Sequence, residues 1–166
     1  AYSFDGGDDY VEIPHDESLQ PQTITVAAWV NADAFEKNTS ILCKYQASGV
    51  DSWDLRPKSD GAVEFITGNN GSVTSSTTLS TDTPHHVAGT YDGSTIAIYI
   101  DGSQDNSVAN TQGIPTNTDY VSIGTGFDID GGSRHFDGRI DDPRLYNKAL
   151  SSTEMSNLYN TGSISG

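Results

Sequence analysis

Asp-Gly pairs recur between the apolar runs of this chain and divide it into short segments, and this feature constrains the fold more than any other in the sequence. Asp and Gly readily adopt the positive backbone angles of tight hairpin turns. Short segments separated by such turns are typical of antiparallel sheets, which close into sandwiches or barrels. The pairs that lie between apolar runs begin at residues 60, 92, 101, 130 and 137.

The segments between the turns alternate apolar and polar residues, as β-strands do. The clearest is residues 94–100, in which Ile96, Ile98 and Ile100 share one face. Residues 23–30 are apolar on both faces, as in a strand buried between two layers. Further strands are predicted at residues 40–45, 52–56, 62–67, 85–91, 120–125 and 139–146.

One short helix is predicted at the end of the chain. Ser151 and Glu154 have the spacing of a capping box, and Gly162 is a suitable end residue. Met155, Leu158 and Tyr159 form an apolar stripe, which we expect to pack on the sandwich. The chain of 166 residues is therefore predicted to be one domain, residues 1–166, with a sizeable core.

The charge balance excludes some partners. With 23 acidic and 8 basic residues the net charge is −15, which repels nucleic acid and anionic membrane surfaces. No apolar run approaches the ~20 residues that membrane insertion requires. Such a surface is adapted to high salt, binds divalent cations, or does both. Sequons at Asn38 and Asn70 fit exposed loops of an extracellular or surface protein.

Four blocks in order carry a family resemblance: YSFDGGDDYVEIP, TITVAAWVNAD, HHVAGTYDGSTIAIYIDG and FDGRIDDPRLYNKALSSTEMSNLY. Together they resemble the laminin-G-like domains of the concanavalin A-like lectin/glucanase superfamily. The resemblance implies a jelly-roll sandwich whose first and last strands meet. Pro84 and the pair Asp142-Pro143 depart from the family pattern. Since proline removes a ladder donor, we expect the strand at Pro143 to bend or to lie at an edge.

Catalysis is not expected. Family relatives that hydrolyse glucans carry alternating acids on one strand, in the form Glu-x-Asp-x-Glu, and this chain has no such triplet. Asp141 and Asp142 would point to opposite faces of a strand, so they do not form a carboxylate pair. His85 and His86 are strand neighbours and cannot chelate one ion together. The chain is therefore predicted not to be an enzyme.

Calcium is the expected cofactor, in a structural role. Calcium takes oxygen ligands from carboxylates and carbonyls. Superfamily members often hold such an ion where the first and last strands meet, and the matching acids here are Asp5, Asp8 and Asp141. The alternative is that these aspartates only cap turns and solvate the surface. Asp137 is expected to form a turn with Gly138.

A glycan site would combine aromatic rings with polar side chains that hydrogen-bond sugar hydroxyls. Trp53 has two possible roles: it contacts a ligand, or it lies in the core beside Leu55. Trp29 and Cys43 are expected in the core. Loops carry binding more often than strands do. The predicted ligand-binding residues are Tyr45, Asp51, Trp53, Arg56, Phe127 and His135, and Tyr120 is a further aromatic candidate.

The sequence thus predicts a non-catalytic carbohydrate-binding or adhesion domain with a glycan or polysaccharide partner. The alternative is a protein-interaction or structural domain of a surface filament, coat or virus particle. A glycan site predicts an exposed aromatic side chain with acids beside it. A protein-interaction domain predicts an apolar patch of several hundred Å².

Overall fold

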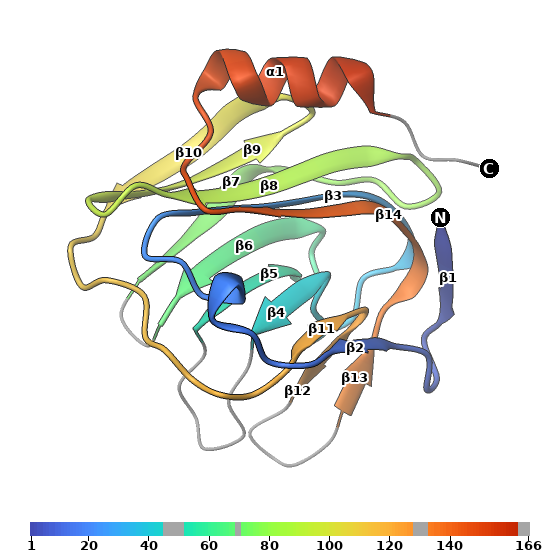
Figure 1. Ribbon diagram of the computed structural model, residues 1–166. Helices are drawn as coiled ribbons and strands as arrows, with labels where there is room; N and C mark the ends of the chain where they lie inside the picture. Colours follow the sequence, from blue (N-terminus) through green and yellow to red (C-terminus); the bar gives the residue numbers. More distant parts are fainter. Residues whose placement is uncertain (45–51, 69–70, 128–132, 163–166) are drawn as a thin grey trace.

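Two antiparallel β-sheets packed face to face form the body of the molecule (Figure 1). The computed structural model describes residues 1–44, 52–68, 71–127 and 133–162. One sheet, here called the helix-covered sheet, has the order β1 (Tyr2–Asp5), β14 (Asp137–Tyr146), β3 (Ile24–Ala34), β8 (His85–Tyr91), β9 (Thr95–Ile100), β10 (Ser103–Ala109). The second sheet has the order β2 (Val11–Ile13), β11 (Val121–Ile123), β4 (Leu42–Lys44), β5 (Trp53–Pro57), β6 (Ala62–Thr67), β7 (Ser72–Thr78).

Three smaller elements lie outside these sheets. β12 (Thr125–Phe127) and β13 (Ser133–His135) pair with each other, and a short 3-10 helix, η1, spans Glu17–Leu19. All the ladders of the described residues are antiparallel, which confirms the predicted jelly-roll sandwich.

The core lies between the sheets and follows the alternation of the strands. Ile96, Ile98 and Ile100 of β9 all face inward, as their spacing predicts. Trp53 and Leu55 share the inner face of β5, and both are fully buried. The indole N–H of Trp53 donates a hydrogen bond to the Leu19 carbonyl at 3.0 Å. The prediction that Trp53 binds a ligand is therefore wrong, because strand alternation places this ring in the core.

A helix covers the outer face of one sheet. Helix α1 (Ser152–Thr161) begins at the predicted capping box of Ser151 and Glu154 and lies over β8, β9 and β10 (Figure 1). Met155 and Leu158 are buried against a surface of small residues, and this confirms the predicted packing. That second apolar cluster contains Ala27, Ala88, Ala97, Tyr99, Leu150, Met155 and Leu158.

His86 lies in the same layer, buried beside Trp29 and Tyr159, whose rings stack on each other. Its ring centroid is 5.4 Å from that of Trp29, and its Nδ1 has no hydrogen-bond partner among the described residues. Its neighbour His85 instead lies 2.9 Å from Asp101 Oδ2. The two rings thus lie in different environments, as their neighbouring strand positions predict. Burial lowers the pKa of His86 from 6.5 to about 4, because the charged ring would lose its hydration.

This lowered pKa predicts a pH dependence of stability. The unfolded chain binds a proton at His86 between about pH 6.5 and pH 4, whereas the folded chain does not. The free energy of unfolding should therefore fall by about 3 kcal/mol as the pH falls through that window. Urea titrations at pH 7 and at pH 4.5 should show a smaller loss in His86→Gln than in the wild type. Equal losses in the two proteins would contradict this assignment.

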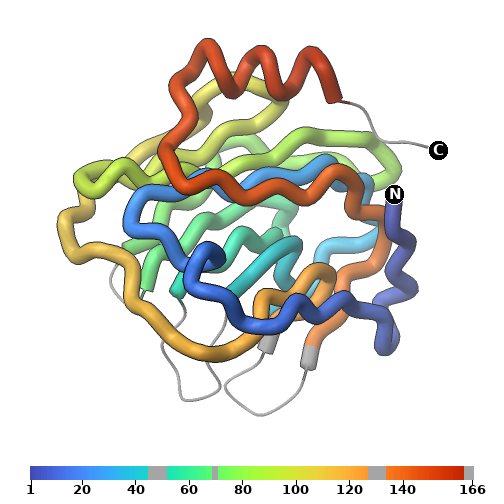
Figure 2. Tube along the Cα trace, in the orientation of Figure 1, coloured from blue at the N-terminus to red at the C-terminus, as the bar shows by residue number. Residues whose placement is uncertain are grey.

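The first and last strands pair, as the resemblance implies. β1 pairs with β14 in the register Tyr2↔Ile140 to Asp5↔Asp137, and Figure 2 shows the first residues beside the strand that precedes the helix. At Pro143 β14 bulges as expected. Trp29 pairs with Asp141 and Ala27 pairs with Arg144, so an extra residue is accommodated on β14.

The predicted turn at Asp137 and Gly138 is wrong. Both residues lie inside β14, where Ala34 pairs with Asp137 and Ala32 pairs with Gly138, so Asp33 has no partner in the ladder. Gly138 has φ +133°, which an L side chain rarely adopts. A Cβ on this residue would lie 2.3 Å from the Asn31 carbonyl oxygen. The glycine therefore permits a bulge between two packed strands rather than a reversal of the chain.

Candidate functional site

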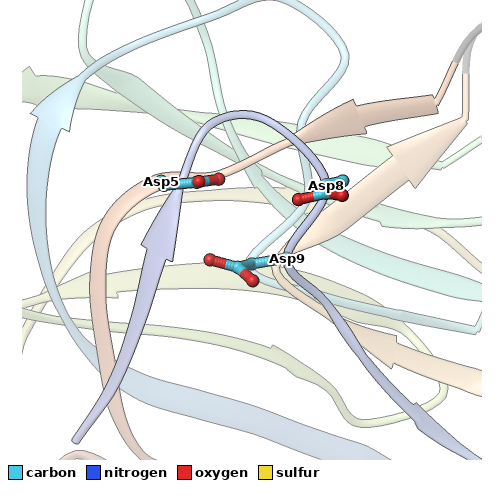
Figure 3. Close-up of side chains that lie close together, drawn as sticks. All are labelled: Asp5, Asp8 and Asp9. Atoms are coloured by element: carbon cyan, nitrogen blue, oxygen red, sulfur yellow. The ribbon is translucent and has the colours of Figure 1, made fainter.

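The turn between β1 and β2 carries three aspartates close together. One carboxylate oxygen from each of Asp5, Asp8 and Asp9 lies within 4.8 Å of the others, and all three residues are exposed. Figure 3 shows Asp5 on one arm of the turn and Asp8 and Asp9 on the other, with Asp5 and Asp9 directed toward each other. We call these three residues the aspartate cluster.

Local hydrogen bonds shape this turn. Gly6 has φ +72°, and its N–H donates to the Phe136 carbonyl at 3.1 Å, which ties the turn to the residue before β14. The Gly7 N–H donates to Asp5 Oδ1 at 2.8 Å and so fixes that carboxylate. The sequence Asp5-Gly6-Gly7 thus lets the chain reverse tightly, which brings the acids of the two arms close together.

The structure brings only two of the three predicted metal ligands together. Asp5 and Asp8 belong to the aspartate cluster, whereas Asp141 lies beyond the other end of the β1–β14 ladder. Asp141 Oδ1 lies 3.1 Å from the Ala1 nitrogen and accepts the Asp142 N–H at 3.0 Å. The register places Asp137 opposite Asp5 instead. Asp141 is therefore not part of this cluster, and Asp9 is its third member.

A cavity of about 340 Å³ lies beside the cluster, and we call it the turn cavity. This volume is near the lower end of small-molecule sites, about 300–1,000 Å³. Three carboxylates and two basic side chains line it, so it offers hydrogen-bond acceptors and donors at once. Its lining residues are Asp5, Gly6, Gly7, Glu36, Thr39, Arg134, His135 and Asp137.

An aromatic pair, the exposed Tyr10 and the half-buried His135, adjoins the turn cavity. Tyr10 is 50% exposed, and its ring centroid lies 5.8 Å from that of His135, at an interplanar angle of 38°. His135 Nδ1 lies 3.2 Å from the Asp9 carbonyl oxygen, so the histidine connects the cavity to the aspartate cluster. The sequence suggested His135 but not Tyr10, although Tyr10 directly follows the acids in GGDDY.

The other predicted ligand residues lie elsewhere. Arg56 does not line the turn cavity; its Nε and Nη2 donate to Glu64 Oε2 at 3.0 and 2.9 Å. Tyr120 is partly buried, and burial raises the pKa of its hydroxyl, with a smaller contribution from Glu12. Phe127 ends β12, where it pairs with Ser133. Tyr45 and Asp51 lie outside the described residues.

The aspartate cluster has the chemistry that a hard cation requires. Its side chains offer oxygen atoms only, and their combined charge favours a divalent ion. The cluster is exposed, so water molecules could complete a coordination shell of six to eight oxygens. The residues therefore fit calcium better than zinc, which favours nitrogen and sulfur ligands in structural sites.

Residues 5–156 match the laminin G family described as the concanavalin A-like lectin/glucanases superfamily. The chain therefore belongs to this family, as its four sequence blocks suggested. The comparison with curated proteins finds no match. Among the described residues, no helix has the length and apolar character needed to cross a membrane.

Solved structures share the fold at low sequence identity. A Bacteroides ovatus protein described as a carbohydrate-binding candidate has a TM-score of 0.75 at 22% identity, over 93% of this chain and 45% of its own. Domain 4 of an extracellular arabinanase from Geobacillus stearothermophilus, in complex with arabinotriose, has a TM-score of 0.73 at 17% identity, over 95% of this chain and 87% of its own.

A third structure is CBM40 of the Ruminococcus gnavus IT-sialidase, bound to α2,3-sialyllactose, with a TM-score of 0.75 at 12% identity. The alignment covers 95% of this chain and 97% of that one. This chain thus spans less than half of the Bacteroides ovatus protein but nearly all of the other two domains. At these identities the likeness shows a shared fold only. The function has to be argued from the residues of the site.

Proposed function

We propose that this chain is a carbohydrate-binding domain and that it holds a sugar at Tyr10 and His135, against the turn cavity. The observation that carries this proposal is the exposed Tyr10 ring beside a cavity lined with carboxylates. A tyrosine face can pack on the apolar face of a sugar ring, while carboxylates such as Asp137 and Glu36 accept hydrogen bonds from its hydroxyls.

The comparisons support this proposal without carrying it. The family includes lectins by its description, and two of the similar structures contain arabinotriose or sialyllactose. In the proposed role the domain binds and does not react, and the expectation that the chain is not an enzyme stays a prediction. An extracellular or cell-surface location belongs to the same proposal, because polysaccharides and surface glycans are found there.

The rival role, a protein-interaction or coat domain, has less support from the surface. A partner interface would need a contiguous apolar patch. In the described part of the chain the exposed large apolar residues are spread over both sheets and their edges. β1 and β10, which carry two of them, lie at opposite edges of the helix-covered sheet. These residues are Tyr2, Tyr10, Ile13 and Val108.

Calcium is part of the proposal, but with a different set of ligands from the one that the resemblance implied. We infer that Asp5, Asp8 and Asp9 hold the ion, in place of the set that includes Asp141. Asp5 ends β1 and Asp9 precedes β2, so a bound cation would link the two arms of the turn. It would also offset the mutual repulsion of three carboxylates, and its role would be to stabilise the rim of the sugar site.

Tyr10→Ala should weaken glycan binding about tenfold, because a stacked aromatic ring contributes on the order of 1 kcal/mol beyond the area it buries. Tyr2→Ala is a matched control, since Tyr2 is 55% exposed and precedes the same turn on β1. Isothermal titration with the best-binding glycan measures both. Equal losses in the two variants would contradict the placement of the site.

A further inference from the structure

A second cavity stands out by the sign of its charge. It has a volume of about 330 Å³ and lies at the ends of β5 and β6, and we call it the basic cavity. Lys37, Arg56 and Lys58 line it, together with Asn38, Pro57 and Glu64. The whole chain has only 8 basic residues against 23 acidic ones. That three of the eight line one cavity is a concentration of positive charge on an otherwise acidic protein.

The pairing of these side chains leaves the cavity positive. Glu64 is its single carboxylate among the described lining residues, and it accepts hydrogen bonds from Arg56 Nε and Nη2. Arg56 also lies 3.7 Å from Asp54 Oδ2, so its charge is balanced by acids and the excess positive charge comes from the two lysines. Lys37 and Lys58 are exposed, and neither ammonium group forms an ion pair with a described residue. Elsewhere Lys148 pairs with Glu154, at the start of α1. Two lysines that line one cavity and pair with no described acid are groups that an anionic ligand can use.

The backbone holds both lysines on defined turns. The Lys58 N–H donates to the Ala62 carbonyl at 2.8 Å, and the Gly61 N–H donates to the Lys58 carbonyl at 2.9 Å. On the other side, Asn38 has φ +62°, and the Thr39 hydroxyl donates to the Glu36 carbonyl at 3.3 Å. The backbone beneath both lysines is therefore fixed, so their side chains start from defined positions at the cavity.

The two cavities share one wall. In the segment 36–39, Glu36 and Thr39 line the turn cavity, whereas Lys37 and Asn38 line the basic cavity. Carboxylates outnumber the basic side chains Arg134 and His135 in the turn cavity, whereas basic side chains outnumber the carboxylate in the basic cavity, so an anionic group favours the basic cavity. A saccharide of more than one unit could therefore meet both cavities, with its charged unit on the basic side.

We propose that the basic cavity binds the carboxylate of an acidic sugar unit, next to the saccharide site at Tyr10. This inference rests on the proposed function and adds the class of saccharide. The net charge of −15 does not prevent it. At 0.15 M salt the Debye length is about 8 Å, so the distant acids are screened while Lys37 and Lys58 contact the ligand directly.

An array of acidic oligosaccharides tests the proposal, with each member printed beside its carboxyl methyl ester. The members contain galacturonate, glucuronate, mannuronate or sialic acid, and the ester removes the charge while it keeps the sugar. We expect at least one acid to bind about tenfold more tightly than its ester, since charge-assisted hydrogen bonds to two lysines are lost. The proposal would be overturned if every acid on the array bound no more tightly than its own ester.

Variants then assign the charge to this cavity. Lys37→Gln with Lys58→Gln should lower the affinity for the selected acid to that of its ester and leave the ester unchanged. Lys148→Gln is the control, because it removes one lysine charge next to α1, away from the cavity. It should change neither the affinity for the acid nor the affinity for the ester. A double lysine variant that binds the acid as tightly as the wild type would overturn the assignment. Circular dichroism verifies that each variant is folded.

Two further outcomes separate this inference from the proposed function. Tyr10→Ala should weaken the acid and the ester equally, because it acts on the neutral part of the sugar. If the lysine variants weaken binding and Tyr10→Ala does not, the proposal for the basic cavity is supported and the proposed sugar site at Tyr10 is contradicted. Inorganic sulfate that binds the basic cavity as tightly as the best acid would show a site for free anions and would overturn the assignment to a saccharide.

Discussion

Gly138→Ala should lower the free energy of unfolding by about 3 to 5 kcal/mol. Two costs add, because φ +133° strains any L residue and the new Cβ would meet the Asn31 carbonyl oxygen at 2.3 Å. Backbone strain of this kind costs about 1–3 kcal/mol, and overpacking costs about as much again. For a domain of this size each kcal/mol lowers the melting temperature by about 2–4 °C. Thermal unfolding should therefore shift by about 10 °C.

Gly93→Ala is the matched control for this substitution. Gly93 has φ +97°, but a Cβ there would meet no atom within 4 Å. It should therefore show only the cost of strain, about 1–3 kcal/mol. If the two variants melt at the same temperature, the close packing of β14 on β3 is not what requires Gly138. Because Asp137 precedes this glycine, Gly138→Ala should also disturb the turn cavity.

Calcium should stabilise the folded chain strongly. At a free concentration of a thousand times the Kd, an ion that binds only the folded state adds about 4.1 kcal/mol. For a domain of 166 residues this corresponds to a rise of roughly 10 °C in melting temperature. Asp8→Asn with Asp9→Asn should abolish the rise. In the presence of a chelator the same double variant should be at least as stable as the wild type, because it removes two of three neighbouring carboxylate charges.

Asp141→Asn is the control that separates the two possible ligand sets. Asp141 lies outside the aspartate cluster and contacts the Ala1 nitrogen. This variant should therefore keep the full calcium response, even if its melting temperature is lower in both conditions. A wild-type protein whose melting temperature does not respond to calcium would contradict the calcium proposal. Loss of the response in Asp141→Asn would restore the ligand set that the resemblance implied.

Strands with β-branched or alternating residues could be predicted from the sequence. The predicted bounds of β6 and β8 agree with the structure, and β3 extends the predicted strand 23–30 by four residues. The polar strands β7 (SVTSSTT) and β10 (SQDNSVA) were missed. Hydroxyl and amide side chains give no apolar period, so these strands form because β6 and β9 offer them edges to pair with.

Most of the candidate site could not be predicted from the sequence, because it depends on strand register and burial, which local sequence does not contain. Strand register decides which acid of β14 faces Asp5, and the register selects Asp137 rather than Asp141. Trp53 is buried in the core, whereas Tyr10 is exposed. The residues next to each ring in the sequence do not predict which of the two is buried. Asp5 and Asp8 could be found because they lie in one short turn, where proximity in sequence guarantees proximity in space.

The central claim is that a glycan binds at Tyr10 and His135 beside the turn cavity. The most direct measurement is a glycan array with calcium present, run with the wild type, Tyr10→Ala and Tyr2→Ala under identical conditions. We predict that the wild type and Tyr2→Ala bind the same defined glycan and that Tyr10→Ala loses most of that signal. Binding by Tyr10→Ala at the wild-type level, or a blank array for folded wild-type protein, would contradict the claim.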